Sequence, residues 1–295
     1  MSHIPSDAYV VIIGAMKAGT SSLFTMLAEH PSICPSRVKE PEFFSRHQGH
    51  RLDVARYEDL FDYEPGTHVR CLEASTGYTK FPGEMDVPFR MKQYGIEPRF
   101  LYVVRNPFDR LESEYNFARL NDMPWRYEDP LDLGAVQRSM YYLQIREFLR
   151  WYPDEERYFI VDFDDMVADP VRLASRIFRW CGVDDYTVRS PEPQNVTPPV
   201  SRVEQALKGI PDRWRRFVPD RVVARGRALL RTHDAPAKRC LNEEERARLH
   251  GWIRTDLERF GEAFDVDVGK WGIGAPAGGA DRPSQAGRSR AAETR

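Results

Sequence analysis

The segment from Val10 to Ser22 constrains the fold of this chain more than any other. Its apolar start, Val-Val-Ile-Ile, runs into a turn bracketed by Gly14 and Gly19, and apolar residues at helical spacing follow Thr20. A strand that passes through such a turn into a helix gathers free backbone N–H groups and the positive helix end at one point. We therefore expect an anion-binding turn between a buried strand and a helix.

This turn differs from the phosphate-binding loop of nucleoside triphosphatases. That loop reads G-x-x-x-x-G-K-[ST], and its lysine follows the second glycine and reaches the β- and γ-phosphates. Here Thr20 follows Gly19, and the lysine of the turn is Lys17. No apolar run ends in an aspartate well placed for magnesium; Asp162 and Asp164 come nearest. The residues indicate a turn that holds a phosphate without the apparatus for splitting a triphosphate.

Apolar runs and helix signatures alternate along the chain. Strands are predicted at 9–13, 69–73, 100–104 and 157–163. Helices are predicted at 20–30, at 140–151, at 243–264, and after the start signals Asn106-Pro107 and Asp169-Pro170. This alternation predicts an α/β fold with a central parallel sheet flanked by helices. We expect one domain over residues 1–273 and a disordered tail over 274–295, which lacks large apolar side chains.

Composition narrows the functional class. Apolar residues make up 41% of the chain, enough for a sizeable core, and the net charge of −2 argues against nucleic acid bound by bulk charge. No apolar run is long enough for a transmembrane segment, and the first residues do not resemble a signal peptide. The four cysteines lack C-x-x-C spacing. We expect a cytoplasmic protein without a metal site.

Four segments stand in a fixed order along the chain. They are Ile13-Gly-Ala-Met-Lys-Ala-Gly-Thr-Ser-Ser22, Lys39-Glu-Pro-Glu-Phe-Phe44, Leu101-Tyr-Val-Val-Arg-Asn-Pro-Phe-Asp-Arg-Leu-Glu-Ser-Glu-Tyr115 and Val161-Asp-Phe-Asp-Asp-Met-Val-Ala-Asp-Pro170. Together they resemble the sulfotransferases that use 3′-phosphoadenosine 5′-phosphosulfate (PAPS), in the branch of the heparan sulfate N- and 3-O-sulfotransferases and their bacterial homologues. The resemblance extends from about Val10 to Trp271. It implies a P-loop-like sulfotransferase fold and transfer of a sulfuryl group to a hydroxyl or amine of a small-molecule, lipid or sugar acceptor, leaving adenosine 3′,5′-bisphosphate (PAP).

The resemblance implies a donor site in the first and third segments. Arg105 and Ser113 would converge on the 3′-phosphate, Arg110 either joins them or pairs with Glu114 or Asp109, and Lys17 would also counter charge on the leaving oxygen. Arg202 would close over the 3′-phosphate; it opens the basic stretch 202–239, which is either a solvated surface or a cationic wall beside the ligand. The residues expected to hold the 5′-phosphosulfate are Lys17, Ala18, Gly19, Thr20, Ser21 and Ser22.

On the acceptor side, the resemblance implies that Glu40 is the general base. A carboxylate beside Phe43 and Phe44 would be partly desolvated, which raises its pKa. Glu42 either contacts the acceptor or supports Glu40. Ala74 stands where the heparan sulfate enzymes have a lysine, which weakens the carry-over of a polysaccharide acceptor. The residues expected at the acceptor are Lys39, Glu42, Glu73, Tyr78 and Tyr141.

Two other functions are compatible with parts of the pattern. A P-loop kinase for a small metabolite would use the anion-binding turn, but the position of Lys17 disfavours it. A nucleotide- or carbohydrate-binding module without catalysis would also use it, but such a module has no need for both Lys17 and Glu40.

Overall fold

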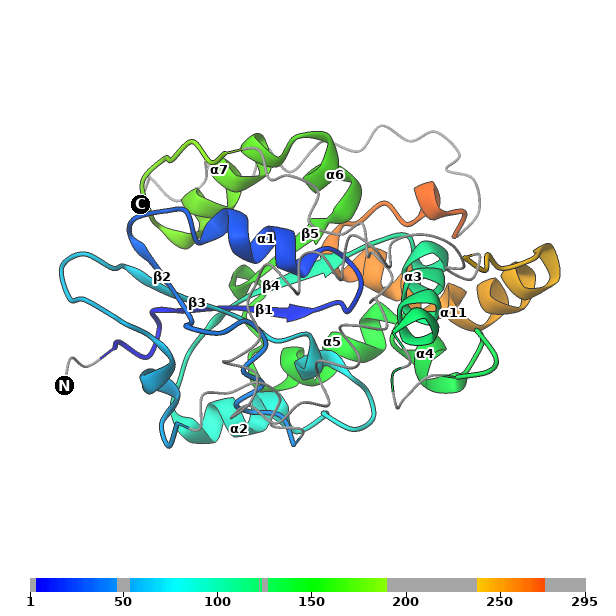
Figure 1. The fold of residues 1–295 in the computed structure, drawn as a ribbon, viewed down its shortest axis with the longest axis horizontal. Helices are drawn as coiled ribbons and strands as arrows, with labels where there is room; N and C mark the ends of the chain where they lie inside the picture. Colours follow the sequence, from blue (N-terminus) through cyan, green and yellow to red (C-terminus); the bar gives the residue numbers. More distant parts are fainter. Residues whose placement is uncertain (1–3, 47–53, 122, 124–126, 190–237, 274–295) are drawn as a thin grey trace, which may run out of the picture.

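A five-stranded sheet lies at the centre of the structure (Figure 1), a computed structural model that describes residues 4–46, 54–121, 123, 127–189 and 238–273. Its strands are β1 (Tyr9–Gly14), β2 (Ile33–Pro35), β3 (Arg70–Ala74), β4 (Arg99–Val104) and β5 (Tyr158–Asp162). Their order is β2-β3-β1-β4-β5, and every pairing is parallel. The predicted α/β fold with a central parallel sheet is therefore confirmed. The expected tail at 274–295 lies outside the described residues.

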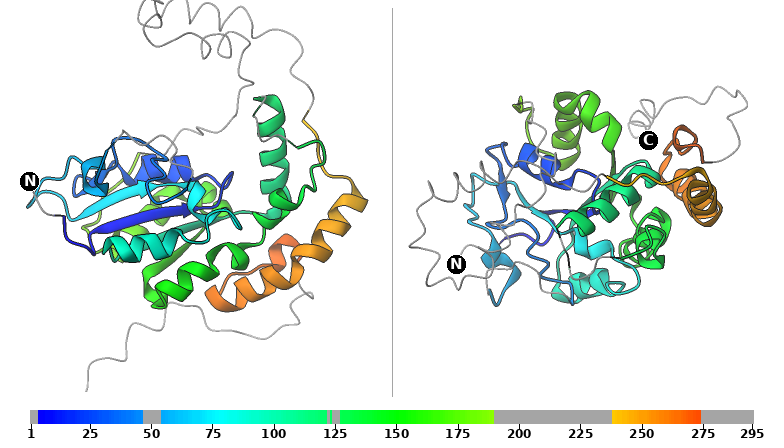
Figure 2. Two further views of the ribbon diagram at one scale, coloured as in Figure 1. Left: turned by 90° about the horizontal axis from the view of Figure 1, so that it is seen from below. Right: turned by 45° about the vertical axis from the view of Figure 1, so that its right-hand side comes forward.

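Helices cover both faces of this sheet. They are α1 (Thr20–Leu27), α2 (Val87–Tyr94), α3 (Pro107–Leu120), α4 (Leu133–Gln137), α5 (Tyr141–Trp151), α6 (Phe163–Ala168), α7 (Pro170–Cys181) and α11 (Glu243–Phe264). Short 3₁₀ turns are η1 (Tyr57–Leu60), η2 (Thr76–Thr79), η3 (Glu155–Arg157) and η4 (Gly269–Trp271). In Figure 1, α1, α6 and α7 lie above the sheet and α2 and α5 below it. Figure 2 shows α11 alongside α5, which it contacts. No helix within the described ranges has the length and apolar character needed to cross a membrane.

The two helical layers explain the unbroken apolar runs of the strands. Phe100 of β4 packs against Phe148 of α5, with ring centroids 5.2 Å apart. Phe159 of β5 packs on the opposite layer, 5.6 Å from Trp180 of α7. A sheet covered on both faces buries residues of both parities, so its strands lose the polar–apolar alternation of a half-exposed sheet.

Capping residues define where several helices begin. The Asn106 side chain accepts a hydrogen bond from Phe108 N (3.0 Å) at the start of α3, and Asp169 caps α7 in the same way. The start signals read from the sequence are thus confirmed. Within the fourth of the four segments, which begins at Val161, the chain forms α6, because Asp162 accepts a hydrogen bond from Asp164 N (2.9 Å) and caps it.

The order of the strands indicates where on the sheet a ligand would bind. After β1 the chain builds β2 and β3 on one side and then crosses to β4 on the other, so the strand order changes direction between β1 and β4. In open parallel sheets, ligands bind outside the carboxyl ends of the strands at such a point. The turn after β1 and the start of α3 after β4 meet there, and α3 and α4 lie beyond that edge (Figure 1).

Candidate active site

The turn after β1 has a backbone that requires its glycines. Gly14 and Gly19 have φ values of 155° and 90°, and a Cβ on Gly14 would lie 2.3 Å from Thr79 Oγ1. A Cβ on Gly19 would lie 2.6 Å from Met166 Cε. Lys17 has φ of 66° without being glycine, a strained conformation typical of functional sites. Because the first N–H groups of a helix lack carbonyl partners within it, the start of α1 at Thr20 offers donors to an anion.

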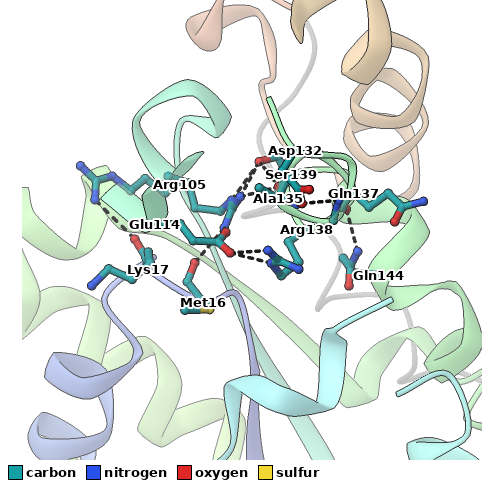
Figure 3. Close-up of polar contacts among 12 residues, drawn as sticks. Met16, Lys17, Arg105, Glu114, Asp132, Ala135, Gln137, Arg138, Ser139 and Gln144 are labelled. Atoms are coloured by element: carbon teal, nitrogen blue, oxygen red, sulfur yellow. Dashed lines mark hydrogen bonds and ion pairs between the residues drawn. The ribbon is translucent and has the colours of Figure 1, made fainter. Parts of the chain in front are cut away.

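Two arginines hold the carbonyl oxygens of this turn. Arg105 Nη1 donates to Lys17 O, and Arg110 Nη1 donates to Met16 O, each at 3.4 Å (Figure 3). Arg105 directly follows β4, and Arg110 lies in α3. The turn is therefore tied to the neighbouring strand–helix unit through its carbonyls, and two positive charges lie along it.

A buried ion network supports Arg110. Its Nη1 lies 2.6 Å from Glu114 Oε2, and both side chains have zero exposure. Arg138 Nε donates to the other oxygen, Glu114 Oε1, at 2.7 Å (Figure 3). Tyr127 donates to that oxygen as well. Burial alone would raise the pKa of Glu114, but Arg110 and Arg138 outweigh it and lower the pKa. Of the alternatives for Arg110, the pairing with Glu114 is the one observed, and Ser139 and Ala135 accept its remaining N–H groups.

The Lys17 ammonium lies in a setting that disfavours charge. Its Nζ is 4.0 Å from the centroid of the Phe117 ring, which belongs to α3. Burial and the positive charge of Arg105 lower the pKa of Lys17, whereas Glu114 and Glu40 raise it. The second motif reaches the same edge of the sheet, because Glu40 N donates to Ala74 O and Ala74 pairs with Ile12 of β1.

Arg105 is fixed through its backbone by Tyr141. The Tyr141 hydroxyl accepts from Arg105 N (3.2 Å) and donates to Arg105 O (2.5 Å). The Arg105 guanidinium lies over the ring of Phe163, 4.6 Å from its centroid. Tyr141 has zero exposure, and its contact with the acceptor stays a prediction; the contact that the structure gives it is with the Arg105 backbone.

Glu40 projects from a strained backbone that β3 holds in place. Its φ is 58°, and its N–H donates to Ala74 O at 2.8 Å. One carboxylate oxygen, Oε1, lies 2.5 Å from Lys39 Nζ and accepts from Thr76 Oγ1 at 3.3 Å. Burial alone would raise the pKa of Glu40, but the charges of Lys39 and Lys80 and these hydrogen bonds lower it. The expectation of a raised pKa was wrong, because it left out the lysines beside the carboxylate.

Two further carboxyl groups lie buried behind Glu40. Glu42 is 5% exposed; its N–H donates to Ser75 Oγ (2.9 Å), and Ser45 donates to its Oε2. Glu73 has zero exposure and accepts from Tyr57 Oη at 3.1 Å and from Ser75. Burial, together with the charge of Glu42, raises the pKa of Glu73 to about 7 against the lowering effect of its hydroxyl partners. Of the alternatives for Glu42, the burial favours support of the Glu40 segment.

The residues expected at the acceptor fall into a buried group and one partly exposed residue, Lys39. Glu42, Glu73, Tyr78 and Tyr141 are each at most 5% exposed and offer an acceptor little or no surface, so their contact with it stays a prediction. Tyr78 lies in η2, where its hydroxyl accepts from Phe44 N at 3.4 Å. Lys39 keeps 24% of its side chain exposed beside Glu40 and remains a predicted acceptor contact.

Most of the residues expected to bind the donor lie in or beside the turn after β1 and in α3. Ala18 is buried at the base of the turn, and Thr20, Ser21 and Ser22 form the first turn of α1. Ser113 is half-buried in α3, and within the described residues no hydrogen bond joins it to Arg105, so their joint grip on a phosphate stays a prediction. Arg202 and all of the basic stretch up to residue 237 lie outside the described residues.

With this geometry, comparison with known proteins is informative. Residues 7–190 match the sequence model of the sulfotransferase domain. The chain belongs to this family. A sulfotransferase from Alicyclobacillus acidocaldarius superposes with a TM-score of 0.61 and 21% identity, covering 91% of this chain and 99% of that one. This likeness shows that the sheet and helices form a sulfotransferase fold.

Curated sulfotransferases are similar over part of the chain. Heparan sulfate glucosamine 3-O-sulfotransferase 5 of Mus musculus is 27% identical over 176 residues, 55% of this chain and 49% of that protein. Bifunctional heparan sulfate N-deacetylase/N-sulfotransferase 3 of Homo sapiens is 26% identical over 196 residues, 59% of this chain and 22% of that protein. The chain therefore spans about half the length of the first of these relatives and less of the second.

Several residues of this sulfotransferase site were not found from the sequence. Phe117 and Phe163 lie under the two donor-side cations, and Thr76 donates to Glu40. Each is an ordinary helix or turn residue by pattern. A signal existed for Phe163, which directly follows an apolar strand inside the fourth motif. For Phe117 there was none, because helical spacing does not indicate which aromatic ring faces a lysine.

Proposed function

We propose that the protein transfers the sulfuryl group of PAPS to a hydroxyl or amine of a small-molecule, lipid or sugar acceptor. One observation carries the proposal: the strained turn with Lys17 accepts a hydrogen bond from the Arg105 guanidinium, and Glu40 is bound to Ala74 at the end of β3, which pairs with β1. Membership of the sulfotransferase family supports it.

The donor side has the chemistry that PAPS requires. The 5′-phosphosulfate is an anion, and the start of α1 supplies N–H groups, the hydroxyls of Thr20 and Ser21, and the positive helix end. Lys17 adds a full charge there. Arg105 offers a planar guanidinium, which suits the 3′-phosphate, with Ser113 as a hydroxyl donor from α3. The residues present thus fit both ends of the donor.

The residues then divide the work of in-line transfer. Glu40 takes the acceptor's proton while the acceptor oxygen or nitrogen forms its bond to sulfur. Lys17 balances the negative charge that develops on the phosphate oxygen as its bond to sulfur breaks. Arg105 fixes the nucleotide so that the two bonds stay in line, which is where most of the rate gain in such transfers arises. Because its pKa is lowered, Glu40 is ionised at neutral pH and ready to accept the proton.

The kinase alternative is less compatible with the site. Asp162, the sequence's nearest candidate for holding magnesium, already caps α6 and is paired with Lys270. The inactive-module alternative does not account for strain at both Lys17 and Glu40.

The test is a product analysis of the full chain. Labelled PAPS with a panel of phenols, amines, lipids and sugars should give labelled acceptor and PAP, with or without EDTA. Magnesium-ATP with the same panel should give no phosphorylated product. Phosphorylation without sulfation would establish the kinase, and a stable PAP complex without turnover on any acceptor would favour the binding module.

A further inference from the structure

The ring of Phe117 lies directly under the ammonium of Lys17. Nζ is 4.0 Å from the ring centroid, within the range of a cation–π interaction. Phe117 is half-buried in α3, three residues after Glu114 and outside every motif that the sequence analysis singled out. The same helix therefore contacts the turn through Arg110 and its lysine through Phe117.

Lys17 needs such a partner because its other neighbours have opposing effects on its pKa. Burial and Arg105 disfavour its charged form, and Glu114 and Glu40 favour it. A lysine side chain is a flexible four-carbon stem that holds no position by itself. A carboxylate at the position of Phe117 would bind the ammonium, but it would also repel the phosphates of the donor. An aromatic face attracts the ammonium without carrying a formal charge.

We propose that Phe117 is a positioning residue for sulfuryl transfer, whose ring holds the Lys17 ammonium beside the turn that binds the donor. The proposal rests on the function proposed above. It assigns to α3 a part in the chemical step, in addition to the donor binding expected from Ser113 of the same helix.

A second ring in the site provides a matched comparison. Phe163, at the start of α6, lies under the Arg105 guanidinium at 4.6 Å and is also half-buried. The two rings thus serve cations with different tasks, since Lys17 acts on the leaving oxygen and Arg105 on the remote 3′-phosphate. Loss of each ring should therefore affect a different kinetic constant.

Steady-state kinetics of Phe117→Leu, Phe117→Tyr and Phe163→Leu test this. Phe117→Leu should lower kcat by roughly 3- to 30-fold, the range of a partly desolvated cation–π contact, with the donor KM within about twofold. Phe117→Tyr keeps an aromatic ring and should have a kcat close to that of the wild-type protein. Phe163→Leu should instead raise the donor KM. Equal kinetic defects in Phe117→Leu and Phe117→Tyr, or a Phe117→Leu defect confined to KM, would overturn the proposal.

A measurement without turnover separates this proposal from the proposed function. Reductive methylation with ¹³C-formaldehyde keeps each lysine charged and gives it NMR-visible methyl groups; the Lys17 signal is the one lost in Lys17→Arg. Methyl protons above the Phe117 ring should be shifted upfield, and the shift should vanish in Phe117→Leu. A protein that transfers nothing yet shows this shift would refute the proposed function alone. Absence of the shift from the ligand-free protein would refute the placement of Lys17 by Phe117.

Discussion

The expected donor side, around Lys17 and Arg105, and the expected acceptor side, around Glu40, hold their charged groups by different means. On the donor side, Lys17 and Arg105 are cations that lie over aromatic rings, and Arg105 bonds a carbonyl of the turn. On the acceptor side, the Glu40 carboxylate is paired with the Lys39 ammonium, and hydroxyl groups donate to the carboxyl groups of Glu42 and Glu73. The two cations thus lie over uncharged rings, whereas the expected base lies against an opposite charge.

The comparison also shows how two neighbouring carboxyl groups, those of Glu40 and Glu73, acquire different pKa values. Glu40 lies against Lys39, which lowers its pKa, whereas burial raises the pKa of Glu73 to about 7. Glu42 is buried beside them and supports the backbone. The carboxylate that is both partly exposed and ionised at neutral pH is Glu40, and this is the state that a general base needs.

The largest expected effect comes from removing that base. Glu40→Gln keeps the size of the side chain and the hydrogen bond to Thr76, but it cannot take a proton. Turnover on a hydroxyl acceptor should fall by about 10²–10⁴-fold, while calorimetric binding of PAP stays unchanged. Glu42→Gln is the matched control and should retain more turnover. If Glu42→Gln is inactive and Glu40→Gln is not, the roles of the two carboxyl groups are reversed.

The pH profile sharpens the same prediction. Because Lys39 helps to lower the pKa of Glu40, the acid limb of kcat/KM should lie below the ordinary glutamate value and the rate should be flat through neutral pH. Lys39→Met should move this limb upward, and Glu40→Gln should abolish it. A limb that does not move in Lys39→Met would show that the ion pair is absent in solution.

The next largest effect lies on the donor side. Lys17→Ala removes the charge that we propose faces the leaving oxygen, so kcat should fall by roughly 10²–10³-fold, as when one preorganised oxyanion donor is lost. Donor affinity should fall much less, because the charge to be balanced grows in the transition state. Rapid-mix measurement of a single turnover separates the two constants. Weakened donor binding with unchanged turnover would reduce Lys17 to a passive anchor.

Much of the fold was predictable because local patterns determine it. The predicted bounds of α11, 243–264, agree with the structure, where Asn242 and Glu245 form a capping box. The expected helix at 20–30 ends earlier, at Leu27. Strand β2 was missed because three residues ending in a proline show no periodicity, and only pairing with β3 makes them a strand.

The site was predictable to the extent that it lies within contiguous motifs. Lys17, Glu40 and Arg105 all lie in such motifs; in the structure Arg105 bonds Lys17 O, and Glu40 is bound to the end of β3, which pairs with β1. Contacts between distant segments were not predictable. Thr76 donates to Glu40, 36 residues away in the sequence. The ring of Phe117 lies against the Lys17 ammonium only because β1 and β4 are neighbours in the sheet, which no local pattern indicates. The wrong direction for the pKa of Glu40 has the same origin, since charge effects depend on distances that only the fold supplies.

A smaller effect, on stability, tests the neutral state of Glu73. Its pKa is about 7 in the folded protein and near 4.5 when exposed, so folded chains bind the extra proton between these values. The stabilisation is present below pH 4.5 and is lost as pH rises to 7, by at most about 3 kcal/mol. The free energy of unfolding of Glu73→Gln, measured in urea, should lack this loss. A constant difference between wild type and variant from pH 4.5 to 7.5 would mean that Glu73 is ionised throughout.

The smallest effect concerns the nucleotide. Arg105 and Ser113 have no partner in a ligand without a 3′-phosphate, so PAP should bind more tightly than AMP. One charge-assisted contact of this kind is worth roughly 1.5–3 kcal/mol, or about 10- to 150-fold in affinity. Arg105→Met should remove most of this preference by weakening PAP and leaving AMP unchanged, whereas Lys17→Ala should weaken both nucleotides alike because it acts at the shared 5′ end. Calorimetry that gives equal affinities for PAP and AMP in the wild-type protein would contradict the assignment of Arg105 to the 3′-phosphate, and with it the division of the donor side into a reacting end and an anchoring end.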